Sequence, residues 1–290
     1  MKRLTRIATA LIALSFIVAA CQTAAPTAAP TEPPTPDLLA DIMTRGVLRI
    51  STDPNYAPQS FLNDQGQLDG FDVDVAKEVA KRLGVQVEFV TPDWDTITAG
   101  HWGGRWDASI GSMTPTAERA EVLWFTEPYY YSPAQFAVLD DSPLTKVEEL
   151  NGKSICAAAA TTYESYLANN NSLTLIGESI IYQVTDAQVV TYPTDQECAQ
   201  AWAAGRRDFE AWLTNSTTIF GAQEGGIKVK NLGTPVYYEA LAVAIDKSGS
   251  KDPLSLVAKL SEIIKAMRED GTLTNLSMKW YKVDLARKVG

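Results

Sequence analysis

The chain has 290 residues, of which 46% are hydrophobic, and its formal net charge is −10 at pH 7. A chain of this length with this apolar fraction is large enough to bury a core in each of two lobes. The acidic balance argues against nucleic acid and anionic lipid as partners, because both repel a negatively charged surface.

Residues 1–20 are predicted to be a signal peptide that lies outside the fold. Three basic residues at its start precede an apolar run, IATALIALSFIVAA (residues 7–20), which is short for a bilayer span. The run ends in VAAC, which is similar to the lipobox of bacterial lipoproteins, so Cys21 is predicted to carry a lipid. The alternative is an ordinary secretory signal followed by an unmodified cysteine.

Residues 21–43 are predicted to form the lipidated cysteine and a tether. The stretch QTAAPTAAPTEPPTPD (residues 22–37) has almost no large apolar side chains and cannot build a core. Its prolines favour an extended chain of ~3.1 Å per residue, which would hold a domain up to about 50 Å from the membrane. We therefore expect an extracytoplasmic, lipid-anchored protein at the outer surface of the cell membrane or in the periplasm.

Strand and helix patterns alternate from residue 47 onward. The first set comprises strands at 47–52, 85–91 and 106–113 and a helix at 71–84. In this helix the apolar residues recur at helical spacing, Asp72 is a possible N-cap and Gly84 is a stop signal. A strand–helix–strand order of this kind is typical of a parallel sheet flanked by helices.

A second set of the same kind begins near residue 150. It comprises strands at 154–159, 188–193 and 209–215, a short helix in TTYESYLA and a helix in TDQECAQAWAAG. Thr194 and Glu197 form a capping box at the start of that last helix, and Gly205 ends it. The chain therefore carries two α/β units.

Two crossing segments connect these units. Residues 134–141 leave the first unit, residues 237–248 return to it, and a final helical pattern carries an apolar face from 254 to 267. We expect a two-lobed α/β fold in which each lobe is a mostly parallel sheet flanked by helices, with a two-strand hinge and a cleft at the carboxyl ends of the strands. Lobe 1 is predicted to span 44–139 and 238–290, and lobe 2 to span 140–237.

Six motifs in order carry a resemblance over residues 44–285. They are GVLRISTDPNYAP, GQLDGFDVDVAKEVAKRLGVQVEFV, DWDTI, MTPTAERAEVLWFTEPYY, AATTYESYL and DGTLTNLSMKWY. The chain resembles the polar amino-acid-binding proteins of bacterial ABC importers, the family-3 solute-binding proteins. The resemblance implies a type II periplasmic-binding-protein-like fold and a protein that is no enzyme. Its partners would be an amino-acid ligand and an ABC transporter permease, and we expect a monomer.

The resemblance implies a carboxylate site on lobe 1, in the stretch GSMTPTAER. Arg119 would bind the ligand's α-carboxylate through a bidentate pair, for which a guanidinium is suited and an ammonium is not. Ser112 would offer a backbone group, and Thr114 an N–H group and a hydroxyl, to the same carboxylate. The alternative is a surface arginine that pairs with Glu118 or Glu121.

Further ligand contacts are implied on both sides of the cleft. Thr162, with Thr161 beside it, would donate to the carboxylate from lobe 2, where a helix start offers free N–H groups. Tyr56 and Trp94 would line the pocket around the ligand's side chain, the alternative being packing in the core. Asp53 would either reach a polar or cationic ligand side chain or cap the loop that it starts.

Three positions depart from the family's pattern. At Asn215 the family has an aspartate that pairs with the ligand's α-ammonium group, and the approach to it, GRRDFEAWLTN, is two residues longer than usual. Either another carboxylate such as Glu239 or Asp53 does the pairing, or the ligand lacks an α-ammonium group, or the alignment is shifted. Gln59 stands where the family commonly has Phe, which favours a polar ligand. Ala160 replaces a common glycine, which is tolerated if its φ is negative.

The remaining cysteines and the single histidine predict no metal site and no cofactor. Cys156 and Cys198 form a disulfide in an oxidising compartment or stay as two buried thiols. His101 lies in the Gly-rich stretch AGHWGGRW, without a nucleophile motif, and is predicted to be a surface loop residue.

The sequence is compatible with two other functions. A cyclohexadienyl-dehydratase-like enzyme on the same scaffold would need a general acid or base such as Asp53 or Glu239, but no paired carboxylates support it. A ligand-sensing input protein would need a signalling partner.

Overall fold

The computed structural model of the protein describes residues 35–168 and 173–288. The predicted signal peptide, Cys21 and most of the tether lie outside these described residues. Within the described ranges, no helix has the length and apolar character needed to cross a membrane. The same ranges contain no group of three or more His, Cys, Asp or Glu side chains arranged to hold a metal ion.

The helices and strands follow one another along the chain from residue 38 to residue 281. The first part contains α1 (Leu38–Arg45), β1 (Val47–Ser51), β2 (Asn55–Tyr56), β3 (Ser60–Leu62), β4 (Leu68–Asp69), α2 (Phe71–Leu83), β5 (Gln86–Val90), α3 (Trp94–Thr98), β6 (Ala108–Met113) and α4 (Arg119–Val122). Then come β7 (Leu123–Leu139), the 3₁₀ helix Val147–Leu150, β8 (Ser154–Ala158), α5 (Thr162–Ala168), β9 (Gln188–Tyr192), α6 (Asp195–Ala203), β10 (Ala211–Asn215) and α7 (Ser216–Glu224). The last part contains β11 (Val229–Asp246), α8 (Leu254–Glu269) and α9 (Thr272–Tyr281).

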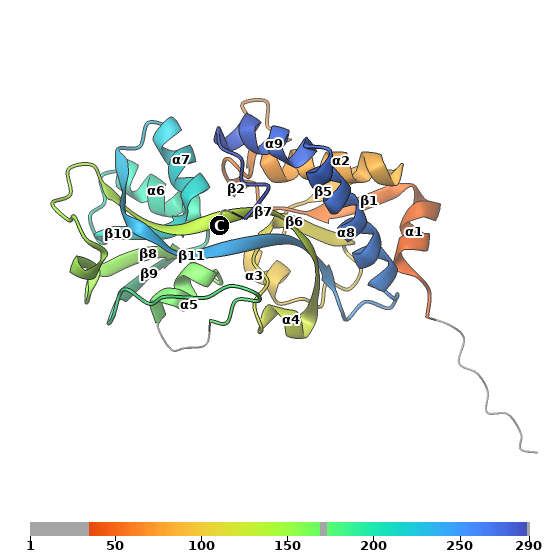
Figure 1. Ribbon diagram of the computed structural model, residues 1–290, viewed down its shortest axis with the longest axis horizontal. Helices are drawn as coiled ribbons and strands as arrows, with labels where there is room; N and C mark the ends of the chain where they lie inside the picture. The colour runs from red at the N-terminus through yellow and green to blue at the C-terminus, as the bar shows by residue number, and fades with distance from the viewer. Residues whose placement is uncertain (1–34, 169–172, 289–290) are drawn as a thin grey trace, which may run out of the picture. The chain divides into compact units, whose positions relative to one another are not determined.

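Two long strands connect the two predicted α/β units. The main sheet has the order β5-β1-β6-β11-β7-β10-β8-β9, with parallel pairing in both outer arms and an antiparallel β7–β11 pair between them. Figure 1 shows β7 and β11 running side by side through the middle of this sheet. The predicted two-strand connection is therefore present, but both strands are longer than the segments 134–141 and 237–248 that predicted it.

Separate hydrophobic clusters define two lobes. Lobe 1 contains the cluster around Phe71, Val243 and Ile264, and lobe 2 contains the clusters around Leu213 and Trp212. Buried residues of β7 belong to the lobe 1 cluster up to position 130 and to the lobe 2 clusters from position 134, and β11 changes lobe between positions 237 and 241. The hinge therefore lies inside these strands, and the limits 44–139, 238–290 and 140–237 stay a prediction.

Helix α2 of lobe 1 begins at Phe71, one residue before the predicted N-cap at Asp72. Gly70 precedes α2 with φ 127, and a Cβ there would lie 2.3 Å from the carbonyl oxygen of Gln59, so only glycine fits. Asp72 is therefore not the N-cap: its buried carboxylate accepts hydrogen bonds from Ser112 and Tyr129 instead. The predicted stop at Gly84 is confirmed, with φ 78.

In lobe 2, two local features hold α6 in place. The backbone N–H of Thr194 donates to Oε2 of Glu197 at 3.2 Å, as the predicted capping box requires. The sulfur atoms of Cys156 and Cys198 are joined at 1.99 Å, which links β8 to α6. Strand β8 ends, and helix α6 begins, at the carboxyl edge of the lobe 2 strands.

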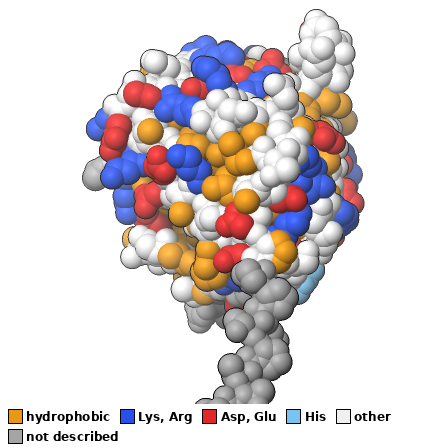
Figure 2. All heavy atoms as spheres, turned by 90° about the vertical axis from the view of Figure 1, so that its right-hand side faces the viewer, with side chains coloured by type: hydrophobic (Ala, Val, Ile, Leu, Met, Phe, Trp, Pro, Cys, Tyr) orange, Lys and Arg blue, Asp and Glu red, His pale blue; other side chains and the backbone are white. Residues whose placement is uncertain are grey.

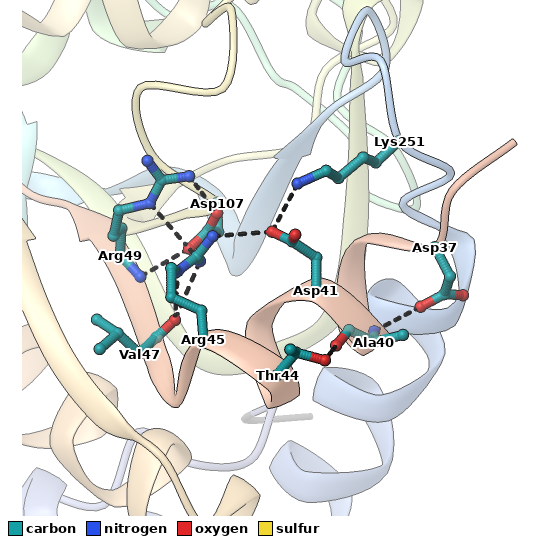
Figure 3. A network of polar contacts seen from close by, with 9 residues as sticks. All are labelled: Asp37, Ala40, Asp41, Thr44, Arg45, Val47, Arg49, Asp107 and Lys251. Carbon is teal, nitrogen blue, oxygen red and sulfur yellow. Dashed lines mark hydrogen bonds and ion pairs between the residues drawn. The ribbon is translucent and has the colours of Figure 1, made fainter.

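An ion-pair network holds α1 and β1 of lobe 1 together (Figure 3). The buried carboxylate of Asp107 lies at its centre, paired with Arg45 at the end of α1 and with Arg49 of β1. Asp107 also accepts from the backbone N–H of Arg49 at 2.8 Å. Asp41 extends the network by pairing with both Arg45 and Lys251. The network ties the first helix to the sheet.

The surface around this end of lobe 1 carries charges of both signs. Figure 2 shows Lys and Arg side chains interspersed with Asp and Glu around a smaller hydrophobic area. The net charge of −10 is therefore not collected on this face as one acidic patch.

Candidate functional site

A cavity with about 460 Å³ of empty space, part of it open to solvent, lies where the two lobes meet. It is lined by Asp53, Tyr56, Trp94, Gly111, Ser112, Thr114, Arg119, Ala158, Thr161, Thr162, Tyr163, Pro193, Thr194, Asp195 and Glu239. Eight of the nine predicted ligand-binding residues are in this set, and Asn215 is the exception. Most of the lining follows the carboxyl ends of β1, β6, β8 and β9, where open α/β sheets bind ligands.

Arg119 is buried in this cavity rather than exposed on the surface. Its side chain is 8% exposed, and its guanidinium donates to the carbonyl oxygens of Thr114 and Ala160, each at 2.9 Å. The guanidinium lies 5.4 Å from the centre of the Trp94 ring. Burial lowers its pKa, which nearby Glu239 partly offsets. Among the described residues no carboxylate forms an ion pair with it, so the pairing with Glu118 or Glu121 is wrong.

Glu239 engages the two threonine hydroxyls that were predicted to bind the ligand. Its Oε1 accepts from the hydroxyls of Thr114 and Thr162, both at 2.6 Å, and its Oε2 accepts from the hydroxyl of Tyr163. Burial raises the pKa of Glu239, while these three hydrogen bonds and the charge of Arg119 oppose the rise. A hydroxyl has one hydrogen to donate, so a bound carboxylate would compete with Glu239 for both threonines.

Ser112 is held by a polar network inside lobe 1. It adopts φ 54, its N–H donates to the hydroxyl of Tyr129, and its own hydroxyl donates to Oδ2 of Asp72 at 2.8 Å. The hydroxyls of Tyr129 and Tyr130 donate to Asp72 and to Ser112 respectively. Burial raises the pKa of Asp72 to about 7. The Ser112 hydroxyl therefore faces lobe 1, which is consistent with a ligand contact through the backbone.

Asn215 lies behind the cavity and connects the lobes. It is fully buried at the N-cap of α7, where its Oδ1 accepts from the N–H of Thr218 at 2.9 Å. The same oxygen accepts from the Gln59 amide at 3.1 Å, and the Asn215 amide donates to the Tyr56 hydroxyl at 2.6 Å. Two of the three departures from the family's pattern, Gln59 and Asn215, are therefore hydrogen-bond partners across the lobes.

Ala160, the third departure, lies beside Arg119. Its φ is 57, so an alanine occupies the left-handed region in which glycine is favoured, and the expected tolerance at negative φ does not apply. Its carbonyl oxygen accepts from Trp94 Nε1 at 3.2 Å as well as from Arg119, and its N–H donates to Glu164. These bonds compensate for the strained backbone and connect the lobes.

The other predicted residues have local roles in addition to lining the cavity. Asp53 accepts from the N–H of Asn55 at 2.7 Å, and burial raises the pKa of its carboxyl group. The Thr161 hydroxyl accepts from the N–H of Glu164 and donates to the carbonyl of Ala158 at 2.6 Å, so it caps α5. His101 is an exposed loop residue, as predicted.

Asp195 lines the cavity but is not among the predicted ligand-binding residues. It is the first residue of α6, its side chain is 4% exposed, and its Oδ1 accepts from Nε1 of Trp212 at 3.3 Å. Burial raises the pKa of this carboxyl group to about 7. Its place after β9 matches that of Thr161 and Thr162 after β8, which is the signal that would have identified it.

Several known proteins are similar to this chain in sequence. The model of the bacterial extracellular solute-binding proteins, family 3, matches residues 48–283. The L-cystine-binding protein TcyJ of Escherichia coli (strain K12) is 30% identical over 257 residues, which are 86% of this chain and 88% of that protein. The histidine-binding periplasmic protein of the same strain is 30% identical over 242 residues, 82% of this chain and 88% of that protein.

A solved structure of a related protein has a similar fold. The ancestral amino acid-binding protein AncCDT-1, a precursor of cyclohexadienyl dehydratase, has a TM-score of 0.70 and 31% identity, and the match covers 84% of this chain and 99% of that chain. This likeness confirms the expected two-lobed α/β fold, and the relatives' names confirm the expected class of binding protein without catalysis. The chain belongs to the bacterial extracellular solute-binding proteins of family 3.

Proposed function

We propose that the protein binds an amino acid in the cavity between its lobes and delivers it to an ABC transporter in the membrane. The observation that carries the proposal is Arg119, a buried cation without an ion-pair partner among the described residues. It lines the cavity at the carboxyl ends of the parallel strands in both arms of the main sheet. A buried charge is stable when it is paired, and a ligand carboxylate supplies the missing partner. The relatives named for cystine and histidine binding support an amino acid as that ligand.

The roles of the cavity residues follow from their chemistry. Arg119 binds the α-carboxylate, with help from Ser112, Thr114, Thr161 and Thr162, whose polar groups line the same cavity. Tyr56 and Trp94 cover the ligand's side chain, and Asp53 contacts a polar or cationic group on it. The predicted lobe limits, 44–139 with 238–290 and 140–237, are part of this proposal.

The location of the protein is part of the same proposal. Cys21 carries the lipid, and the Pro-rich tether holds the two lobes outside the cytoplasm, near the permease. The protein acts as a monomer and binds no nucleic acid. Lipidation adds a mass that mass spectrometry of the protein, with and without the Cys21→Ser change, detects directly.

Calorimetric titration with the twenty L-amino acids and L-cystine tests the binding function. We expect at least one to bind, and Arg119→Lys to weaken that binding by about thirtyfold, because a charged bidentate pair is worth roughly 2 kcal/mol. Arg206→Lys is the matched control, since Arg206 is an exposed arginine that pairs with Asp208 outside the cavity. The proposal fails if no amino acid binds at millimolar concentration, or if both arginine variants behave alike.

A further inference from the structure

We infer that Asp195 binds the α-ammonium group of the amino acid, in the role that family resemblance assigns to the position of Asn215. The inference rests on the proposed function, because it names the residue that recognises one group of that ligand. It concerns a position that the sequence assigned only to the start of a helix.

Asn215 is already engaged by the protein. Its carbonyl oxygen accepts from Thr217, Thr218 and Gln59, and its amide donates to Tyr56. Its side chain is fully buried and does not line the cavity. An ammonium group would reach this amide only after the contacts between α7 and the loop around Gln59 had opened. The same region is closely packed, since Gly221 of α7 lies against Pro58.

Three carboxylates line the cavity and could take the place of Asn215 as the partner of the ammonium group. They differ in how many hydrogen bonds they already accept from the protein. Glu239 accepts from three hydroxyls and lies close enough to Arg119 for their charges to interact. Asp53 accepts from a backbone N–H of its own loop. Asp195 accepts from the indole of Trp212 at 3.3 Å, and the hydroxyl of Thr214 lies close to its carboxylate. Asp195 and Asp53 both accept fewer hydrogen bonds than Glu239, and Asp195 is the more deeply buried of the two, so its ionised form depends more on a cation.

The surroundings of Asp195 also favour a cationic partner. Its side chain is 4% exposed, and an ionised carboxylate at such a depth is costly without a positive charge beside it. The groups that face it are the hydroxyl of Thr214, the indole of Trp212 and the carboxylates of Glu239 and Asp53, none of them a cation. The two carboxylates raise its pKa further, so an ammonium group placed among the three relieves their mutual repulsion.

The position of Asp195 suits a ligand whose carboxylate is held by Arg119. Both residues line one cavity, Arg119 from lobe 1 and Asp195 from lobe 2, so a zwitterion bridges the lobes with its two charged ends. The start of α6 also favours the ionised form of Asp195, because the helix dipole is positive there. The lobe 2 contact would then be made by α6, held to β8 by the disulfide.

Titration with matched pairs of molecules tests this assignment. The probes are L-arginine with guanidinovalerate, L-glutamine with glutaramate, and L-histidine with imidazolepropionate, where the second member of each pair lacks only the α-amino group. We expect Asp195→Asn to weaken the amino acid that wild type binds by about tenfold or more, since a charged hydrogen bond becomes a neutral one. The same variant should bind the partner without the amino group as wild type does.

The matched control is Asp208→Asn, which removes an exposed carboxylate from the same lobe. It should leave both members of each pair unchanged. Asparagine has the shape of aspartate, and the preference for the amino acid is a ratio measured within each variant, so a general loss of folded protein cancels. The inference is overturned if Asp195→Asn weakens both members equally or keeps the full preference. A wild type that binds none of the amino acids defeats the proposed function instead.

A pH profile provides a second readout. The Asp195 pKa of about 7 lies well above the 3.8 of an unperturbed aspartate, so Asp195 gains its charge as the pH rises through neutrality. Affinity for L-arginine or L-glutamine should increase about tenfold between about pH 6 and about pH 8. Asp195→Asn should flatten this profile. An unchanged slope in the variant would assign the titration to another group and overturn the inference.

Discussion

Behind the lobe 1 side of the cavity, four hydrogen bonds join Ser112, Asp72 and two tyrosines. On the lobe 2 side, the groups that face Asp195 from its own lobe are an indole, in a long hydrogen bond, and the hydroxyl of Thr214. The groups of this lobe 1 network already satisfy one another's hydrogen bonds. The lobe 2 side carries the buried carboxylate of Asp195, whose oxygens can accept further hydrogen bonds. The difference shows how each lobe holds its charged group: Arg119 of lobe 1 lies beside a preorganised polar network, whereas Asp195 of lobe 2 lies among few hydrogen-bond donors.

The two lobes are also reinforced in different ways. In lobe 2 a disulfide joins β8 to α6, three residues from Asp195, so the reinforcement lies next to the site. In lobe 1 the ion-pair network around Asp107 joins α1 to β1, and none of its members lines the cavity (Figure 3). Removing the first should therefore affect both stability and binding, and removing the second should affect stability alone.

The largest effect is expected for the disulfide. Cys156→Ser with Cys198→Ser should lower the free energy of unfolding by about 4 kcal/mol, because the bridge closes a loop with a sequence separation of 42. Urea unfolding of the variant, compared with wild type with and without reductant, measures this. The variant should also bind its amino acid more weakly, since α6 is less well held. Equal stability of the oxidised and reduced protein would contradict the prediction.

A change at Asp107 should affect stability but not binding. Asp107→Ala should lower the free energy of unfolding by about 3 kcal/mol, because it removes the buried acceptor shared by Arg45, Arg49 and the N–H of Arg49. Affinity for the amino acid should stay within about twofold of wild type, since the network lies outside the cavity lining. Asp208→Ala, which breaks an exposed pair, serves as the control and should leave the unfolding midpoint in place. A loss of affinity in Asp107→Ala at temperatures where it is folded would remove the distinction between the two lobes.

The sequence predicted the parts of this molecule that depend on local pattern. The helix ending at Gly84, the capping box of Thr194 and Glu197 and the alternating strands follow from residue spacing alone. Arg119 was identified because its motif resembles that of the family. What these patterns share is that each is read within a short stretch of chain.

The features that the sequence did not predict depend on residues far apart in the chain. Glu239 lies on β11, which pairs with β6 just before Thr114, and it meets Thr162 at the start of α5 in the other lobe. Asp195 was assigned to a helix start, and its depth in the cavity follows from how β9 and α6 pack. The departures at Gln59 and Asn215 were considered separately, although a hydrogen bond across the lobes joins them.

The smallest predicted effect is that of removing the hydrogen bond between Gln59 and Asn215. The Gln59 amide donates to Asn215, Thr217 and Thr218, all on the α7 side of the interface, and these bonds exist only while the lobes are together. Gln59→Met keeps the length of the side chain and removes the donor, so closure should lose about 1 kcal/mol and affinity should fall about fivefold. Calorimetry measures the affinity, and small-angle scattering with and without the amino acid measures how far the lobes separate. The control is Gln67→Met, which changes a glutamine in an exposed turn.

If Gln59→Met binds the amino acid as wild type does, the hydrogen bond between Gln59 and Asn215 does not stabilise the closed arrangement of the lobes. The hydrogen bonds from Arg119 and Trp94 to the carbonyl of Ala160 are then enough to hold the lobes together.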